Sequence, residues 1–165
     1  MGTVTRQLES ASPEQTRALG VALGRLLLPG DFVGLMGELG AGKTEFSRGV
    51  AEGAGVPRGE VASPTFAIVY PYQGRIPLFH ADLYRLADEE ELYATGFFDL
   101  LTEGTGAFLV EWIDRIPAAM PQDALDLRIQ TVSIDQRRFL VSARGERSPR
   151  LLDAWVEAIG ADLEM

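Results

Sequence analysis

A glycine-rich octapeptide constrains the fold of this chain more than any other feature of its sequence. Residues 37–44 match the pattern Gly-x-x-x-x-Gly-Lys-Ser/Thr at every fixed position. In this pattern the glycines let successive backbone N–H groups face a phosphate, the lysine reaches the β- and γ-phosphates, and the final hydroxyl binds Mg²⁺. The sequence therefore predicts a nucleotide-phosphate site made of Gly37, Glu38, Leu39, Gly40, Ala41, Gly42, Lys43 and Thr44, with the backbone N–H of Glu45 also available to a phosphate.

The residues on either side of the octapeptide predict the strand and the helix that such a motif needs. Residues 32–36 form a short apolar run, which is typical of a buried parallel strand. After the motif we expect a helix that runs through Phe46 and Val50 to about Gly53. A helix that begins at the loop places its partially positive N-terminus against the bound phosphate.

The N-terminal segment predicts a short strand over residues 3–8, followed by a helix. Ser12 is expected to cap this helix, with Pro13 at its first position and Gln15 closing a capping box. Residues 29–31, Pro-Gly-Asp, are expected to end it. Four leucines recur at the spacing of one helical face, namely Leu19, Leu23, Leu26 and Leu27.

The middle of the chain predicts a hairpin and then a strand that ends in a carboxylate. Residues 66–72 and 76–82 are expected to pair, and Pro71 and Pro77 indicate sheet edges or bulges. A helix is expected over residues 88–94. Residues 107–111 are four uncharged residues followed by Glu111, the form of a Walker B strand, and ligands in open α/β sheets sit at the carboxyl ends of the strands.

The last third of the sequence changes character. Apolar and polar residues alternate over 125–130, which we interpret as a half-buried antiparallel strand. A turn at 135–137 is expected to lead into a partner strand over 138–143. Ser148-Pro149 is expected to cap a final helix.

Composition excludes several classes of protein. The 165 residues fit one domain, 1–165. With no Cys and one His, neither a disulfide framework nor a Cys/His zinc site can form. No apolar run approaches the ~20 residues that span a membrane, and the N-terminus lacks the apolar core of a signal peptide. We therefore expect a cytoplasmic protein with no membrane partner.

The charge balance disfavours direct binding of nucleic acid. The chain has 24 Asp+Glu against 15 Lys+Arg, a formal net charge of −9, whereas proteins that grip nucleic acid by themselves usually carry a basic face. The acidic run at 88–91 would repel phosphate, and its simpler interpretation is the solvated start of a helix.

Lys43 is the only lysine of the chain, and the other 14 basic residues are arginines. A sequence with arginine at every other basic position is expected to need a compact ammonium here rather than a planar guanidinium. The chain also contains no asparagine, so the guanine-reading Asn-Lys-x-Asp motif of GTPases is excluded.

Four strings together resemble the TsaE (YjeE) family, bacterial ATPases of tRNA threonylcarbamoyladenosine biosynthesis. They are the octapeptide, Ser-Pro-Thr-Phe at 63–66, His-Ala-Asp-Leu-Tyr-Arg-Leu at 80–86 and Val-Glu-Trp at 110–112. Many ATPases and GTPases share the octapeptide, whereas the other three strings in this order are selective. The resemblance implies an α/β, P-loop NTPase-like three-layer fold with a mixed parallel/antiparallel central sheet and flanking helices.

The same resemblance implies an activity and partners. It implies Mg²⁺-dependent ATP hydrolysis in association with the TsaD–TsaB threonylcarbamoyl transferase, which modifies adenosine 37 of tRNA. In the family the ATPase supports turnover of this complex and neither makes nor transfers the threonylcarbamoyl group. The tRNA is then met mainly indirectly, which agrees with the acidic charge of the chain.

The resemblance also assigns roles to single residues. Lys43 takes the place of the phosphate lysine, and Thr44 that of the hydroxyl that binds Mg²⁺. Glu111 matches the acidic residue of the metal site, and Asp82 an acid that orients or deprotonates the attacking water.

Two threonines and one departure complete the family comparison. Thr65 matches a switch residue that follows the γ-phosphate, and Thr16 a residue near the adenine. Glu45 stands where the family usually has threonine. Because a carboxylate in the first helical turn lies near the phosphates, we expect weaker nucleotide binding unless Glu45 points outward or pairs with an arginine such as Arg48.

Several residues have two interpretations. His80 shares a strand face with Asp82 and could neighbour the site, although a hydrogen-bonded packing role is favoured. Trp112 fits a lid or interface aromatic as well as plain core. Arg137 and Arg138 are expected to be solvated on a hairpin, with a contact to adenine or phosphate as the alternative.

One rival function uses the same loop. A small-molecule kinase would close an arginine-rich lid over its acceptor, and three arginines near the C-terminus could form one, namely Arg144, Arg147 and Arg150. No acceptor pocket can be identified from the sequence, so the partner-dependent ATPase is preferred.

Overall fold

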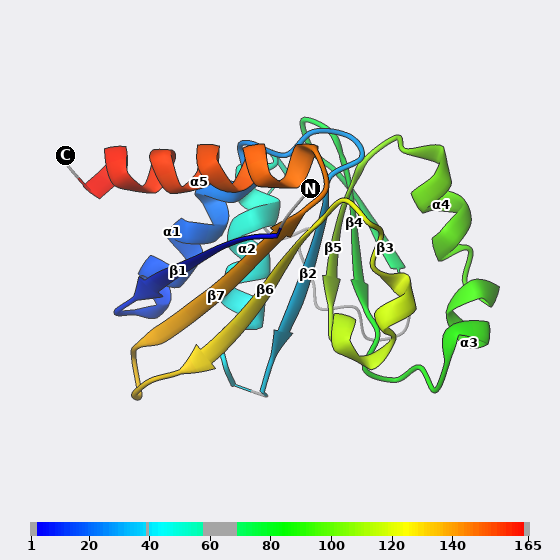
Figure 1. Cartoon of the computed structure of the whole chain (residues 1–165), viewed down its shortest axis with the longest axis horizontal. Helices are drawn as coiled ribbons and strands as arrows, with labels where there is room; N and C mark the ends of the chain where they lie inside the picture. Colours follow the sequence, from blue (N-terminus) through cyan, green and yellow to red (C-terminus); the bar gives the residue numbers. More distant parts are fainter. Residues whose placement is uncertain (1–2, 39, 58–68, 164–165) are drawn as a thin grey trace.

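The computed structural model describes residues 3–38, 40–57 and 69–163, and these form a seven-stranded mixed sheet between helices (Figure 1). The order across the sheet is β1-β7-β6-β2-β5-β4-β3. The strands are β1 (Val4–Ser10), β2 (Phe32–Gly37), β3 (Val69–Gln73), β4 (Pro77–Asp82), β5 (Ala107–Glu111), β6 (Ala124–Thr131) and β7 (Arg137–Arg144). The helices are α1 (Pro13–Gly24), α2 (Lys43–Gly53), α3 (Glu89–Ala94), α4 (Phe97–Glu103) and α5 (Arg147–Leu163), with short 3-10 turns η1 (Ile113–Arg115) and η2 (Pro117–Ala119).

The central strands run in the same direction. β2 is parallel to both β5 and β6, and β5 is parallel to β4, whereas the pairs β3–β4, β6–β7 and β1–β7 are antiparallel. The register places Glu111 opposite both Leu35 and Asp82. The carboxyl ends of β2, β4 and β5 therefore meet at one edge of the sheet.

Helices cover both faces of the sheet, each over its own apolar cluster. α1, α2 and α5 pack on one face around Leu23, Phe46 and Trp155. On the other face α3, α4 and the two 3-10 turns enclose a cluster that includes Phe97 and Phe108. The predicted three-layer α/β fold with a mixed sheet is confirmed. Within the described residues, no helix combines the length and apolarity that crossing a membrane requires.

The start of α1 follows the prediction, whereas its end does not. Ser12 accepts the N–H of Gln15 at 3.1 Å, as expected of a capping residue. The helix ends at Gly24 rather than at residues 29–31. The guanidinium of Arg75 donates hydrogen bonds to the carbonyls of Gly24, Arg25 and Leu27 at 3.0–3.2 Å. This distant arginine therefore supplies hydrogen-bond donors to the backbone carbonyls that the end of the helix leaves unpaired.

The strand over 124–131 differs from its antiparallel interpretation. β6 is antiparallel to β7 but parallel to β2 on its other side. Alternating burial shows that one face is solvated and does not report the direction of each neighbouring strand. Pro71 lies in the edge strand β3, as predicted, and Pro77 is the first residue of β4.

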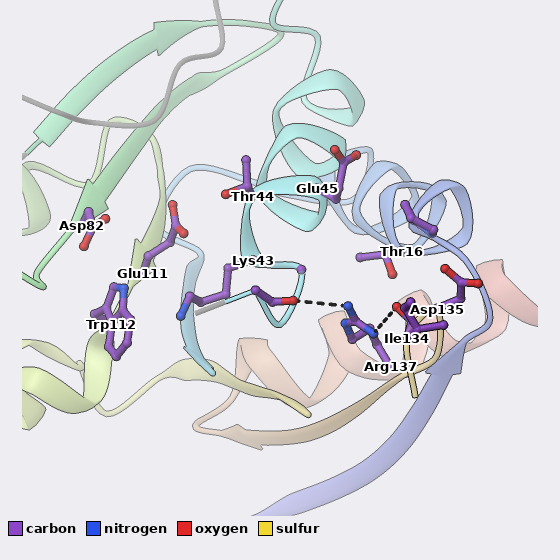
Figure 2. A pocket seen from close by; sticks show the side chains of 13 residues that line it. Thr16, Lys43, Thr44, Glu45, Asp82, Glu111, Trp112, Ile134, Asp135 and Arg137 are labelled. Atoms are coloured by element: carbon purple, nitrogen blue, oxygen red, sulfur yellow. Dashed lines mark hydrogen bonds between the residues drawn. The ribbon is translucent and has the colours of Figure 1, made fainter. Parts of the chain in front are cut away.

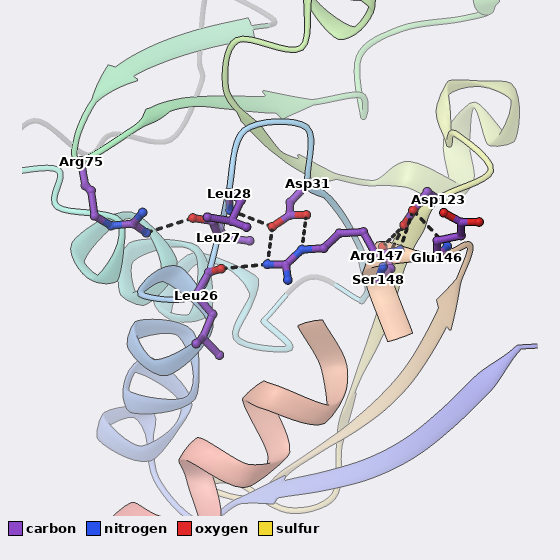
Figure 3. A network of polar contacts seen from close by, with 9 residues as sticks. All are labelled: Leu26, Leu27, Leu28, Asp31, Arg75, Asp123, Glu146, Arg147 and Ser148. Atoms are coloured by element: carbon purple, nitrogen blue, oxygen red, sulfur yellow. Dashed lines mark hydrogen bonds and ion pairs between the residues drawn. The ribbon is translucent and has the colours of Figure 1, made fainter. Parts of the chain in front are cut away.

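Asp123, rather than Ser148, caps the final helix. Its carboxylate accepts the N–H groups of Glu146, Arg147 and Ser148 at 3.2, 2.8 and 2.9 Å, and the hydroxyl of Ser148 at 2.6 Å (Figure 3). Burial alone would raise the pKa of Asp123, but these hydrogen bonds lower that pKa below its ordinary value. Sequence reasoning missed α4, because its N-cap is Gly96 and supplies no side-chain signal.

An ion pair with a buried carboxylate fixes α5 to the other end of the sheet from the glycine-rich loop. Asp31, only 3% exposed, precedes β2 and binds Arg147 through two contacts of 3.1 and 3.2 Å (Figure 3). The same guanidinium donates to the carbonyl of Leu26 at 3.1 Å. Arg147 is therefore committed to the amino end of β2.

Candidate active site

A pocket of about 360 Å³ lies where the central parallel strands end (Figure 2). At one end it is bordered by Lys43 and Thr44 from the start of α2, by Asp82 from the end of β4, and by Glu111 and Trp112 from the end of β5. The other end is lined by residues of α1 and of the β6–β7 turn, namely Pro13, Thr16, Ile134, Asp135 and Arg137. The fold thus assembles one pocket from segments that are far apart in the sequence.

The glycine-rich loop has the conformation that its glycines allow. Gly40 and Gly42 adopt φ values of 81° and 100°, a left-handed region that side-chain-bearing residues rarely enter. No side chain caps the helix that begins at Lys43. Its first N–H groups therefore remain available to an anion, and the helix dipole favours negative charge there.

Lys43 is turned into the pocket and is only 6% exposed. Its ammonium group donates to the carbonyl of Gly37 and approaches that of Glu38 at 3.4 Å. The same nitrogen lies 3.7 Å from the centroid of the Trp112 ring. Burial lowers the pKa of Lys43, and the carboxylates of Glu111, Asp82 and Asp114 oppose that shift. The only lysine of the chain is thus held over an aromatic face, among acids.

Asp82 and Glu111 are neighbours at the ends of adjacent parallel strands. An oxygen of Asp82 accepts the N–H of Tyr84 at 2.9 Å, which orients the carboxylate. Burial raises the pKa of Asp82; the Tyr84 hydrogen bond opposes this rise and the nearby charge of Glu111 adds to it. Two carboxylates therefore line the pocket together with Lys43.

His80 is a buried, hydrogen-bonded residue that also contacts a residue of the site. Of the two interpretations of the sequence, the one that places His80 beside the site therefore applies. Its Nε2 lies 2.5 Å from an Oε atom of Glu111, and its Nδ1 lies 3.4 Å from the hydroxyl of Tyr72. His80 and Glu111 are 3% and 6% exposed. Because both side chains are enclosed, this contact fixes the orientation of the Glu111 carboxylate.

Trp112 forms a wall of the pocket rather than part of the closed core. It is half-buried, and its ring lies 4.8 Å from that of Tyr84 between centroids. Its backbone has φ 58°, the only positive value of a non-glycine residue in the described ranges. Such a conformation costs on the order of 1–3 kcal/mol and is retained where the surroundings impose it.

Arg137 is the main site residue that sequence reasoning misplaced. Its guanidinium donates to the carbonyls of Ala41 at 3.0 Å and Ser133 at 2.9 Å. It also donates to the carbonyls of Gly40 at 3.2 Å and Ile134 at 3.3 Å (Figure 2). It therefore clamps the glycine-rich loop to the β6–β7 turn instead of pointing into solvent. Strand alternation offered a signal, because Arg137 shares a face with the core residue Phe139 and Arg138 does not.

The remaining predicted residues lie in several different places. Thr16 is buried in the pocket wall and shares a hydrogen bond of 2.7 Å with Ser10. Glu45 lines the pocket, but its carboxylate lies 3.5 Å from the guanidinium of Arg48. Glu45 is therefore paired with an arginine, the condition under which we did not expect its charge to weaken nucleotide binding. Ala41 is buried, Gly37 and Glu38 line a neighbouring cavity, and Leu39 and Thr65 lie outside the described residues.

The oxygen donors of the pocket fit Mg²⁺ bound together with phosphates. No group of three or more His, Cys, Asp or Glu side chains arranged to hold a metal occurs among the described residues. Mg²⁺ seldom uses such a cage; it is usually held by one or two carboxylates, phosphate oxygens and waters. The Thr44 hydroxyl and the Glu111 carboxylate, which line the pocket together with Lys43 (Figure 2), offer that kind of donor set.

Comparison with known proteins identifies the family. The protein-family model described as "Threonylcarbamoyl adenosine biosynthesis protein TsaE" matches residues 10–139 of this sequence. The chain belongs to the TsaE family. A TsaE relative from Bacillus subtilis strain 168 is 40% identical over 146 residues, 87% of this chain and 89% of that protein. A TsaE relative from Streptomyces coelicolor is 43% identical over 142 residues, covering 79% and 92%. Both carry the name tRNA threonylcarbamoyladenosine biosynthesis protein TsaE.

A solved structure has the same fold. The crystal structure of YdiB from Bacillus subtilis superimposes with a TM-score of 0.78 at 30% identity and covers 95% of this chain and 97% of that one. The similarity therefore extends over the sheet and both helical layers of this TsaE-family chain.

Proposed function

We propose that this TsaE-family protein is a Mg²⁺-dependent ATPase of tRNA threonylcarbamoyladenosine biosynthesis, and that its ATP hydrolysis supports turnover of a TsaD–TsaB threonylcarbamoyl transferase acting on adenosine 37. The names of the relatives support the pathway. The observation that carries the proposed activity is one pocket holding Lys43, Thr44, Asp82 and Glu111 at an uncapped helix N-terminus.

Phosphoryl transfer to water requires mostly positioning and stabilisation of charge. In the proposed mechanism Lys43 and the first N–H groups of α2 bind the phosphates. Thr44 and Glu111 would hold Mg²⁺, and the ion would supply positive charge that stabilises the phosphate oxygens. Asp82 positions the attacking water, and His80 keeps the Glu111 carboxylate in place.

Within the described part of the chain, the pocket offers no uncommitted arginine for the transferred phosphoryl group, which supports stimulation of ATP hydrolysis by a partner protein. Arg137 is the arginine among the described lining residues, and each of its guanidinium nitrogens already donates to backbone carbonyls. A phosphoryl-transfer site of this kind gains much of its rate from an arginine aimed at the transferred group. We therefore expect slow hydrolysis by the isolated chain and faster hydrolysis in the complex.

The positions of the C-terminal arginines argue against the rival kinase. Arg147 is paired with Asp31 at the amino end of β2, whereas the pocket lies at the carboxyl end. Arg144 contacts the sulfur of Met120 at 2.6 Å. Neither arginine lines the pocket, and Arg150 does not line it either, so the expected lid does not form over it.

The decisive experiment measures phosphate release from ATP with and without a purified TsaD–TsaB complex. We expect the complex to accelerate release by the wild type, and Lys43→Ala to abolish the acceleration. Asp82→Ala should reduce hydrolysis more than ATP binding. Equal turnover by Lys43→Ala, or phosphate recovered on a small-molecule acceptor, would refute the proposal.

A further inference from the structure

A second cavity, of about 560 Å³, opens beside the nucleotide pocket and has no role in the mechanism above. It lies between the start of the glycine-rich loop, the segment after β5, and the ends of β6 and β7. Its charged side chains are Glu38, Asp114, Arg128 and Arg138, and Trp112 lines both this cavity and the nucleotide pocket.

The cavity continues onto an uncovered part of the sheet. On β1, β6 and β7 the residues that alternate with the core are half-buried or exposed, and the exposed ones include Gln7, Arg128, Leu140 and Arg144. α1 and α2 lie behind these strands in Figure 1, on the opposite face of the sheet. Over β2, β5 and β4, the face that carries Arg128 and Leu140 is covered by the apolar cluster that α3, α4 and the 3-10 turns enclose. One half of this face is thus open and polar.

Two arginines of the cavity have donors without good acceptors. The Nε of Arg138 is buried and has no hydrogen-bond partner in the described structure, although it forms a long ion pair of 3.7 Å with the exposed carboxylate of Glu9. Arg128 faces the thioether sulfur of Met36 at 3.8 Å, a weak acceptor. Buried polar groups in native proteins nearly always have a partner, so the Nε of Arg138 indicates a missing acceptor.

The strand register brings the two guanidinium groups onto one face. Arg128 is opposite Leu140 and Arg138 is opposite Gln130, so the two arginines are diagonal neighbours across the β6–β7 pair. Diagonal pairs of long side chains lie within reach of one another on a sheet surface. Together they offer planar, charged donors that match carboxylate geometry.

We propose that this cavity is the docking site for an acidic segment of a partner protein, whose carboxylates accept hydrogen bonds from Arg128 and Arg138 while an apolar side chain packs on Trp112. A protein segment fits better than nucleic acid, because the net charge of −9 repels a long phosphate backbone along its whole length, whereas a short segment brings only the carboxylates that pair with Arg128 and Arg138. The proposal rests on the proposed function, since the partner is the transferase complex.

A segment bound in this cavity can influence nucleotide binding through one side chain, Trp112. Trp112 is a shared wall, and its ring lies 3.7 Å from the ammonium nitrogen of Lys43. A segment that restrains Trp112 therefore acts on the group that binds the phosphates. Such coupling is reciprocal, so nucleotide in the pocket changes the affinity for the partner.

The test reverses the charge of the cavity. The full-length double variant Arg128→Glu/Arg138→Glu is compared with Arg25→Glu/Arg150→Glu, which has the same net charge but alters exposed arginines elsewhere. Affinity for the purified TsaD–TsaB complex is measured by calorimetry, and ATP binding by the isolated variants reports the fold. We expect the cavity variant to lose at least about tenfold in affinity for the complex, the range of a desolvated interfacial charge contact, and to retain ATP binding.

A second arm separates failure of this inference from failure of the proposed function. Hexaglutamate is titrated into the isolated wild type while tryptophan fluorescence is followed, and we expect a saturable change that the cavity variant lacks. If the wild type ignores the complex but shows this change, the proposed partner is wrong and the acidic site stands. Equal losses in both double variants, no response to either probe, or a cavity variant that loses tRNA binding instead would overturn the inference.

Discussion

Single side chains set the chemistry of the pocket, and His80 is the one whose role is most directly testable. We expect His80→Ala to weaken Mg²⁺-dependent binding of a non-hydrolysable ATP analogue by about tenfold, because partners that orient metal ligands contribute on the order of 10–100-fold to metal affinity. His80→Gln places an amide nitrogen near the position of Nε2 and should restore part of the loss. Calorimetric titration of Mg²⁺ at fixed nucleotide measures both. A similar defect in the two variants would indicate packing alone.

The charge of Glu45 gives a second test with single residues. Since Arg48 lies 3.5 Å from Glu45, we expect Glu45→Thr to change ATP affinity little and Arg48→Ala to weaken it a few-fold, in line with the ~0.2–1 kcal/mol of an exposed ion pair. In a Glu45→Thr background the Arg48→Ala effect should disappear. A double-mutant cycle of ATP dissociation constants checks this. Tighter binding by Glu45→Thr alone would show that the ion pair does not compensate the carboxylate.

Between elements, the clamp formed by Arg137 joins the β6–β7 turn to the glycine-rich loop. Arg137→Ala removes charged hydrogen bonds to Gly40, Ala41 and the turn, so we expect ATP affinity to fall about tenfold and unfolding free energy to fall by about 1.5–3 kcal/mol. Urea unfolding and calorimetry measure the two effects. Arg138→Ala, the next residue on the opposite face, serves as the matched control. The clamp is disproved if both variants bind ATP equally well.

For the molecule as a whole, Asp123 makes stability depend on pH. Its folded-state pKa is lowered, so its contribution is present above the unfolded-state pKa of about 3.9 and is lost as pH falls through the folded value. Asp123→Ala should cost about 1 kcal/mol at neutral pH, typical of a helix cap. The difference from wild type should shrink as pH falls below about 4.

Urea unfolding of both proteins across this pH range makes the comparison. Asp153→Ala, at an exposed aspartate of α5, is the control and should show little pH-dependent difference. If the difference in unfolding free energy between wild type and Asp123→Ala stayed constant below about pH 4, the cap would not depend on the ionised carboxylate.

The local features of the chain were predictable because neighbouring residues specify them. The glycine-rich loop and the helix after it follow from residues 37–44, and the cap Ser12 is also a local signal. The buried strands around Phe32 and Phe108 were visible as apolar runs. The family resemblance added the fold class, which the sheet and the match to TsaE proteins confirm.

What failed in the prediction depends on partners far apart in the chain. Asp123 replaces Ser148 as a cap, Arg75 shapes the end of α1, and Arg137 clamps the loop, each across at least 23 residues. Alternation in β6 could not report a parallel neighbour on one side.

The sequence by itself thus determined the phosphate loop, the order of most elements and the identity of the family, since short-range periodicity, turn chemistry and motif spacing encode these directly. Only the tertiary structure decided that Glu111 is held by His80, that Lys43 lies over Trp112, and that a second cavity opens beside them. The physical reason is the register of parallel strands, which sets side chains beside one another whatever their separation along the chain.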